Sequence, residues 1–192
     1  VRTFGGIDIL VNNASAIFLA GPLATPLKRF DLMQQVNVRG TWLACQLCLP
    51  HLLQADNPQI LTFAPPVNLA PHWFAQHTAY TMAKYGMSMT VTGLAAEFAG
   101  QVAVNGLWPA TVIDTAALAM LGGRVDRTHC RTPAIMADAA WHVLTIGRGG
   151  PSGRFFIDEE VLRAAGVNDF SAYAVAPGQP LQRDLFLDPV QH

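Results

Sequence analysis

The sequence has few charged residues, and neither sign dominates. Only 13% of its 192 residues are charged and the formal net charge is −1, against 51% hydrophobic residues. Without a basic surplus, we expect neither nucleic acid nor an anionic membrane surface as a partner. No apolar run reaches the roughly 18 residues that a membrane-spanning helix needs, and no secretory signal opens the chain. The composition instead suits a compact domain with a buried sheet.

Cysteines are scarce as well, and they form no pattern that binds metal. The three are Cys45, Cys48 and Cys130, an odd number at spacings unlike those of a disulfide framework. A reducing interior such as the cytoplasm is therefore expected. Cys45 and Cys48 fall on one predicted helix without a second Cys or His pair nearby, and the six His show no metal-ligand spacing. We expect core packing for these two thiols and no metal site.

What is present is an alternation of short apolar runs with longer stretches of helical periodicity. We predict strands at residues 7–11, 59–63, 102–108 and 154–158. We predict helices near residues 25–53, 78–99, 115–121, 132–146 and 159–165, the first capped by Thr25 and kinked or ended at Pro50. This alternation favours a parallel sheet in a doubly wound, Rossmann-like α/β fold, with residues 1–192 as a single domain. The Pro-rich, polar residues 176–192 are expected to form an irregular C-terminal arm.

Polar or turn-forming residues follow three of the predicted strands. Ligands of open parallel sheets bind at the carboxyl ends of the strands. The segments Asn12–Asn13, Ala64–Pro65 and Pro109–Ala110 each stand at such an end, so we expect them to face one crevice.

Tyr80 and Lys84 are the best-marked candidates for catalysis. Four positions apart on a predicted helix, they share one face. A free tyrosine has a pKa near ~10, but a nearby lysine cation favours the phenolate and lowers that pKa. Such a pair can pass a proton to or from an alcohol while a cofactor moves the hydride. The alternative is a chance pair on a solvated helix face.

Four segments, in this order, resemble the motifs of the short-chain dehydrogenase/reductase family. They are Asn12-Asn13-Ala14-Ser15, the mid-helix Asn37, the pair Tyr80 and Lys84, and Asn105-Gly106-Leu107-Trp108-Pro109. The resemblance covers about residues 5–160. It implies that the chain is the C-terminal two-thirds of a dehydrogenase, with its later strands and their helices.

The resemblance also implies a cofactor, a substrate class and roles for individual residues. The cofactor would be NAD or NADP, and the small-molecule substrate an alcohol or ketone. Tyr80 would be the general acid/base, Lys84 would lower its pKa and hold the cofactor ribose, and the Asn37 side chain would hold a relay water against Lys84. The cofactor would also meet Asn12, Asn13, Ala14, Pro109, Thr111, Ile113 and Thr115.

A closer likeness is to the hydroxysteroid dehydrogenase-like branch of the family. It is visible in Ala64-Pro65-Pro66 and in residues 80–88, 107–109 and 155–160. This likeness implies a lipid-like substrate and, in a eukaryote, a possible peroxisomal location. We expect Ala64, Trp73, Phe74, Trp108 and Met120 to line an apolar substrate pocket, with ordinary core packing as the equally weighted alternative.

One departure from the family concerns the substrate oxygen. The family has a serine at the end of its fifth strand, where this chain has Ala64 and Pro65, neither of which can donate a hydrogen bond. Loss of such a donor commonly costs about 2.7–4 kcal/mol of transition-state stabilisation. The candidates for a replacement hydrogen-bond donor are Asn68, His72 and His77. The alternative is that they are only polar residues of a surface loop.

A second departure is the absence of a glycine-rich dinucleotide turn after a strand. Without that turn the cofactor pyrophosphate has no cradle. The first residue is Val1, so we expect the sequence to omit an N-terminal segment with three strands. Without that segment, residues 7–11 would form a bare sheet edge.

The leading interpretation is an NAD(P)-dependent oxidoreductase that interconverts an alcohol and a ketone. The alternative is a non-catalytic binding or scaffold protein on the same fold. The two long helices near residues 25–53 and 78–99 form the usual dimer face of the family, so a homodimer or homotetramer is expected.

Overall fold

Four parallel strands form the central sheet of the protein. The computed structural model describes residues 1–119, 123 and 125–188. The strands are β1 (Ile9–Asn12), β2 (Gln59–Thr62), β3 (Ala103–Trp108) and β4 (Phe155–Ile157), in the order β1-β2-β3-β4. Each strand pairs in parallel with the next, so all four carboxyl ends lie along one edge. The predicted parallel α/β sheet is confirmed.

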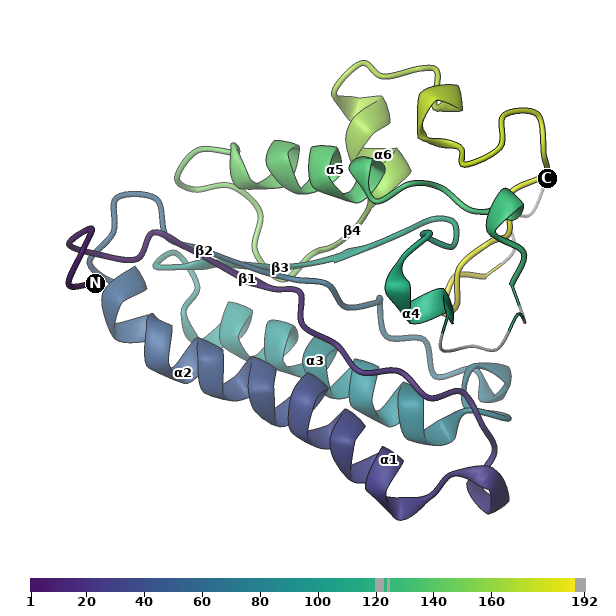
Figure 1. Ribbon diagram of the computed structural model, residues 1–192. Helices are drawn as coiled ribbons and strands as arrows, with labels where there is room; N and C mark the ends of the chain where they lie inside the picture. The colour runs from purple at the N-terminus through teal and green to yellow at the C-terminus, as the bar shows by residue number, and fades with distance from the viewer. Residues whose placement is uncertain (120–122, 124, 189–192) are drawn as a thin grey trace.

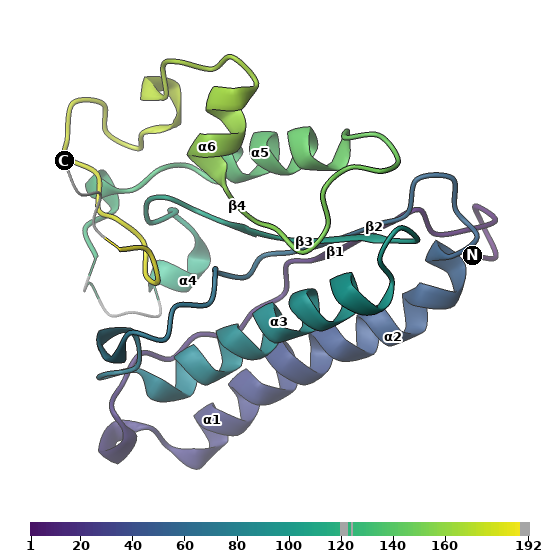
Figure 2. The same cartoon turned by 180° about the vertical axis from the view of Figure 1, so that it is seen from behind.

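Helices cover both faces of this sheet. α1 (Leu27–Met33), α2 (Gly40–Leu52) and α3 (Thr78–Glu97) lie on one face, and α5 (Ala134–Leu144) and α6 (Asp158–Ala164) lie on the other (Figures 1 and 2). α4 (Ala116–Ala119) is a short helix after β3. In the described part of the chain, four 3-10 turns connect these elements, at Pro22–Ala24, Pro71–Trp73, Arg127–His129 and Ser171–Tyr173. No helix within the described residues is long and apolar enough to cross a membrane.

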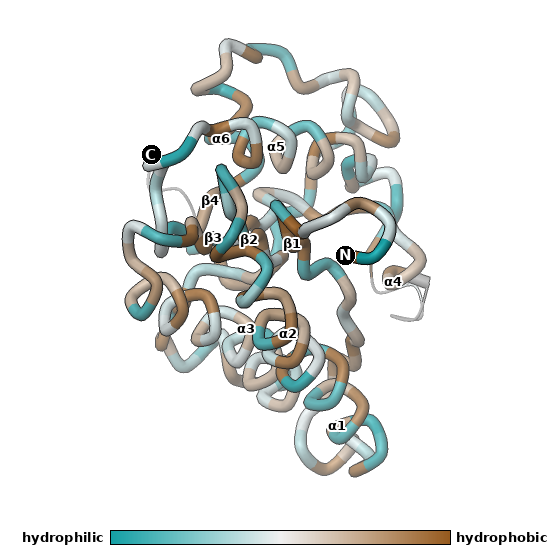
Figure 3. Tube along the Cα trace, turned by 90° about the vertical axis from the view of Figure 1, so that its left-hand side faces the viewer, coloured by the Kyte–Doolittle hydropathy of each residue, from teal (hydrophilic) through white to brown (hydrophobic). Residues whose placement is uncertain are grey.

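An apolar core fills the space on each side of the sheet. Between the sheet and α2 and α3 lies a cluster that includes Leu52, Ile60, Val91 and Val104. Between the sheet and α5 and α6 lies a second cluster that includes Leu61, Leu107, Ile135 and Leu162. In the end-on view the strands run between these two helix layers (Figure 3). The alternation along β2 therefore sends Ile60 to one core and Leu61 to the other.

The helix predicted near residues 25–53 differs from the expectation at three points. A π-helical turn, Gln34–Arg39, separates α1 from α2. Thr25 does not cap the first turn, because its hydroxyl donates to the carbonyl oxygens of Ala20 and Gly21, and Pro26 stands at the N-cap position instead. Pro50 does not end the helix, since α2 runs on to Leu52.

α3 is the element that carries the predicted catalytic pair. Its buried side includes Tyr80, Lys84, Met87 and Val91, which recur at the three- and four-residue spacing of one helix face. Gly86 faces the π-helical turn, where a Cβ would lie 2.6 Å from a methyl carbon of Val38. The glycine thus lets α3 approach that turn closely.

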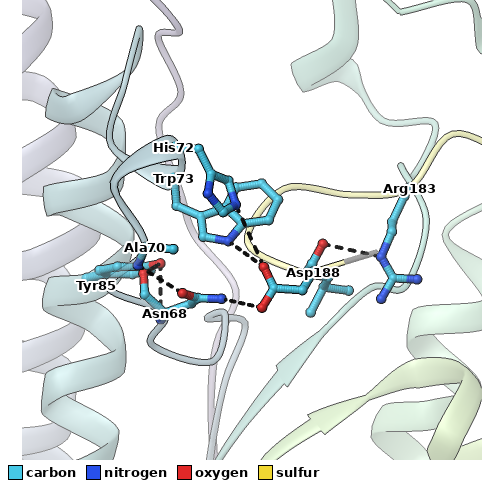
Figure 4. A network of polar contacts seen from close by, with 8 residues as sticks. Asn68, Ala70, His72, Trp73, Tyr85, Arg183 and Asp188 are labelled. Atoms are coloured by element: carbon cyan, nitrogen blue, oxygen red, sulfur yellow. Dashed lines mark hydrogen bonds and ion pairs between the residues drawn. The ribbon is translucent and has the colours of Figure 1, made fainter. Parts of the chain in front are cut away.

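The C-terminal arm, residues 176–188, contains no helix or strand and is held in place by hydrogen bonds to neighbouring segments. The Gln182 carbonyl accepts from Val112 N–H at 2.9 Å, and Asp184 N–H donates to the Ala110 carbonyl at 3.2 Å. Asp188 accepts hydrogen bonds from Asn68 and Trp73 (Figure 4). The arm therefore runs beside the segment that follows β3. The rest of the predicted arm, residues 189–192, lies outside the described residues.

Candidate active site

A cavity of about 720 Å³ opens at the carboxyl ends of β1 and β3. Its walls are mostly apolar and come from the segments after β1 and β3, from α3, α4 and α5, and from the C-terminal arm. The polar and ionisable side chains on its surface include Asn13, Ser15, Tyr80, Lys84, Thr115, Gln182, Arg183 and Asp184. Of the three segments expected to face one crevice, Asn13 and Pro109 line this cavity, whereas Ala64 and Pro65 are not among its described lining residues. The cavity contains both members of the Tyr80 and Lys84 pair.

Lys84 is buried, and the groups in direct contact with its ammonium are neutral. Nζ donates to the Phe63 carbonyl at 2.8 Å and lies 3.5 Å from Ser15 Oγ. It also sits 4.9 Å from the centre of the Trp108 ring, within the range of a cation–π contact. Burial lowers the pKa of Lys84 to about 8, and the negative charge of Asp184 partly opposes that shift. Lys84 therefore remains mainly protonated at pH 7.

Tyr80 is buried beneath the C-terminal arm. Its side chain is 6% exposed and stacks on Phe186, with ring centres 6.2 Å apart. Burial raises the pKa of Tyr80, and the charge of Asp184 raises it further. These two effects are the ones that raise the pKa of Tyr80, and its lowering by Lys84 stays a prediction. Tyr80 is therefore a neutral phenol at pH 7, suited to donating a proton.

Asn37 is fully buried in the π-helical turn and bonds to the loop after β1. Its Oδ1 accepts from Ala16 N–H at 2.7 Å, and its Nδ2 donates to the Ala16 carbonyl at 3.0 Å. Both bonds of the side chain thus fix the loop that carries Asn13 and Ser15. The Asn37 amide therefore anchors this loop, and its role in holding a relay water stays a prediction.

The residues expected to meet the cofactor fall into two groups. Asn13, Pro109, Ile113 and Thr115 line the cavity beside Tyr80 and Lys84. Asn12, Ala14 and Thr111 are not among the described residues that line it.

Asn12 instead stabilises the sheet through hydrogen bonds. Its Nδ2 donates to Thr62 Oγ1 at 3.2 Å and to Cys45 Sγ at 3.4 Å, which ties β1 to β2 and α2. Thr111 is also buried, and its hydroxyl has no hydrogen-bond partner in the described part of the chain.

Only part of the predicted substrate pocket is found in the cavity. Trp108 lines it and donates from Nε1 to the Leu185 carbonyl at 2.9 Å. Ala64, Trp73 and Phe74 lie elsewhere: Ala64 is fully buried, Trp73 bonds to Asp188, and Phe74 packs edge-on against Tyr85. Trp73 and Phe74 are half-buried and pack against the cluster around Phe186, and a substrate-binding role for these three residues stays a prediction. Met120 lies outside the described residues.

The three candidates for a replacement donor are engaged away from the cavity. Asn68 bonds to Tyr85 and Asp188, His72 lies 3.7 Å from Asp188, and His77 lies 3.0 Å from the Thr81 hydroxyl. Figure 4 shows Asn68 and His72 gathered with Trp73 around Asp188. These side chains fasten the C-terminal arm to the loop before α3.

Sequence reasoning missed the contribution of the arm. Asp184 and Leu185 line the cavity, and Phe186 is 1% exposed among the rings of Trp73, Tyr80, Tyr85 and Trp108. The apolar run Leu185-Phe186-Leu187 inside a polar, Pro-rich tail was the available signal, since such a run needs a surface to bury it.

The cysteines are free thiols in the described part of the chain. Cys45 and Cys130 are buried free thiols, and Cys48 is half-buried. Cys45 belongs to the apolar core beneath the sheet and Cys48 packs against it. The described residues include no group of three or more His, Cys, Asp or Glu that could hold a metal ion.

Known proteins with a similar sequence show the family of the chain. The family model described as enoyl-(acyl carrier protein) reductase matches residues 1–139. Hydroxysteroid dehydrogenase-like protein 2 of Danio rerio is 57% identical over 188 residues, and its counterpart in Homo sapiens is 54% identical. These matches cover 98% of this chain and 45% of each relative. The chain therefore spans less than half the length of the curated relatives it matches.

Solved structures agree with both the sequence match and the fold. A crystal structure from Xanthomonas campestris, described as a dehydrogenase, is 62% identical with a TM-score of 0.95. The alignment covers 98% of this chain and 70% of that one. A short chain dehydrogenase from Mycobacterium thermoresistibile is 46% identical with a TM-score of 0.89, over 98% and 67% of the two chains. With its parallel sheet, its motifs and these relatives, the chain belongs to the short-chain dehydrogenase/reductase family.

Proposed function

We propose that the protein is an NAD(P)-dependent oxidoreductase that interconverts an alcohol and a ketone. The observation that carries this proposal is the placement of Tyr80 and Lys84 on one cavity at the carboxyl ends of the sheet. A proton donor and a buried cation, both facing a mostly apolar space, meet the requirements of carbonyl reduction.

The residues around Lys84 suit the polar groups of a nicotinamide nucleotide. Lys84 Nζ and Ser15 Oγ lie 3.5 Å apart on the cavity wall, where they can bind adjacent hydroxyls of a ribose. Asn13 and Thr115 add polar groups for the nicotinamide end, and Pro109 and Ile113 add apolar surface. When bound, NADH or NADPH supplies the hydride.

Tyr80 supplies the proton in the direction of reduction. The hydride adds to the carbonyl carbon, and the oxygen takes the proton of the Tyr80 phenol as it becomes an alcohol. Lys84 stabilises the phenolate left behind, because it is one helical turn away and its charge is not neutralised by an ion pair within the described residues. Oxidation of the alcohol reverses both steps.

The test is turnover of simple ketones by the whole protein with NADH and with NADPH. We expect dinucleotide-dependent reduction that falls about a hundredfold or more in Lys84→Met, since the phenolate then lacks its cation. Thr92→Ala, at an exposed position of the same helix, is the matched control and should keep its rate. No binding of either dinucleotide would defeat the proposal.

The substrate is proposed to be apolar or lipid-like. Ile17, Phe63, Val112, Leu118 and Met136 make most of the cavity wall uncharged. We expect KM to fall as the alkyl chain of a ketone series lengthens, because each buried methylene adds about 0.8 kcal/mol of transfer free energy.

A non-catalytic binding role is the second candidate. The observation that favours it is the burial of Tyr80 under Phe186, which restricts access to the phenol. Ligand binding without turnover of any ketone would support this role. Turnover that disappears in Tyr80→Phe would exclude it.

We also propose that α2 and α3 mediate a homodimer or homotetramer. Exposed apolar side chains stand on these helices, including Trp42, Leu47, Met82 and Met89. Such a surface is typical of an interface between subunits. Light scattering should give at least a dimer, and Leu47→Glu should shift it toward monomer. A wild-type monomer would contradict the proposal.

A further inference from the structure

The C-terminal arm places a carboxyl group in the cavity beside Tyr80 and Lys84. Among the described residues that line the cavity, Asp184 is the only acid. Its Oδ1 accepts the N–H of Leu185 at 2.6 Å, whereas Oδ2 has no hydrogen-bond partner within the described residues. A carboxylate oxygen that faces a mostly apolar cavity without a protein partner favours a ligand that can donate a hydrogen bond.

The position of Asp184 is set by the backbone on both of its sides. Its own N–H donates to the Ala110 carbonyl, directly after β3, and Thr111 forms a β-bridge with Arg183. On the other side, the Leu185 carbonyl accepts from Trp108 and Phe186 is buried in the aromatic cluster. The carboxyl group therefore belongs to a fixed wall of the cavity.

Charged groups from two helices act on Asp184. Lys84 of α3 favours its ionised form, and Asp158 at the start of α6 opposes ionisation. Burial has the largest effect and raises the pKa of Asp184 to about 7, which the bond from Leu185 N–H partly offsets. The negative charge of Asp184 in turn helps to raise the pKa of Tyr80 and of Cys130. Above pH 7 the cavity thus contains a carboxylate.

We propose that Asp184 binds the substrate and distinguishes alcohol from ketone, with its Oδ2 accepting a hydrogen bond from the alcohol O–H while the neutral Tyr80 phenol donates to the alcohol oxygen; for oxidation the O–H turns to the Tyr80 phenolate. A ketone has no O–H, so it leaves the carboxylate oxygen unpaired in an apolar space. This role rests on the proposed alcohol/ketone function and adds to it a residue that selects the redox form. Neither Asn68, His72 nor His77 could do so, because they lie away from the cavity.

The inference is tested by binding of 2-octanol and 2-octanone, a pair of nearly equal size. Calorimetric titrations at pH 8, without added dinucleotide, prevent turnover of either ligand. We expect the wild type to bind the alcohol about tenfold more tightly than the ketone, as for a hydrogen bond to a charged group. Asp184→Leu should bring the two dissociation constants close together. Asp184→Asn, which keeps the shape but loses the charge, should give an intermediate ratio.

Asp188→Asn is the matched control, because it removes the same charge from the same arm outside the cavity. Its ratio should equal that of the wild type. The inference is overturned if the wild type binds alcohol and ketone equally well, or if both Asp184 variants keep the wild-type ratio of dissociation constants. It is also overturned if Asp188→Asn lowers that ratio as much as the Asp184 variants do. If the ratio behaves as expected but no ketone is reduced with either dinucleotide, the alcohol-binding role of Asp184 stands and the proposed oxidoreductase function fails.

Discussion

At the scale of single residues, burial controls the ionisation of the groups around the cavity. Tyr80, Lys84 and Asp184 all have pKa values moved toward their neutral forms, in each case chiefly by burial. Because Lys84 loses its proton near pH 8, we expect the rate of ketone reduction to fall above that pH. Lys84→Arg, which stays charged, should lose this alkaline limb if it retains activity.

Asp158 gives a prediction for stability against pH. It is fully buried at the start of α6, accepts from the N–H groups of Ala110 and Glu159, and has its pKa raised by burial to about 6. Between about pH 4 and 6 the unfolded chain has lost this proton while the folded protein keeps it, so stability falls as pH rises. Ionisation of the buried Asp158 carboxyl therefore lowers the unfolding free energy at neutral pH by about 3 kcal/mol.

Asp158→Asn should remove this decrease in stability with rising pH. The difference in unfolding free energy between Asp158→Asn and the wild type should therefore rise by about 3 kcal/mol from pH 4 to pH 7 in urea titrations. The exposed Asp31→Asn serves as the control for a change of net charge. A difference that does not vary with pH would refute the assignment.

At the scale of elements, the close approach of α3 to the π-helical turn can be tested with two glycines of one helix. A Cβ on Gly86 would meet the stiff, β-branched Val38, whereas a Cβ on Gly93 would meet nothing within 4 Å. We expect Gly86→Ala to destabilise by about 1–3 kcal/mol through overpacking. Gly93→Ala should stabilise by up to about 1 kcal/mol through helix propensity. Equal effects in thermal unfolding would show that the contact is not tight.

The elements were also the features most accessible from the sequence. The strands and α3 were predicted to within about two residues, because their apolar spacing is local and few Gly or Pro interrupt it. The π-helical turn was not, since nothing in residues 34–39 separates it from an ordinary helix. Tyr80, Lys84 and Trp108 were found through spacing and motif. Asp184 and Phe186 were missed, because they reach the site through contacts between residues more than 70 positions apart.

At the scale of the whole molecule, the C-terminal arm joins the segment after β3 to the loop before α3. Phe186 is its main anchor, with rings from both regions around it. Phe186→Ala should lower the unfolding free energy by about 3–5 kcal/mol and should weaken ligand binding at the cavity. Phe4→Ala, at a side chain that is 91% exposed, should change neither. Unchanged ligand binding in a destabilised Phe186→Ala protein would show that the arm does not shape the binding cavity.

The central claim is that Tyr80 donates the proton in a dinucleotide-dependent reduction. The most direct measurement is the rate of NADH or NADPH oxidation by a ketone in wild type, Tyr80→Phe and the surface control Tyr173→Phe. We predict a loss of about a hundredfold or more in kcat for Tyr80→Phe, with unchanged dinucleotide affinity and a normal rate in the control. A wild-type rate in Tyr80→Phe would contradict the account.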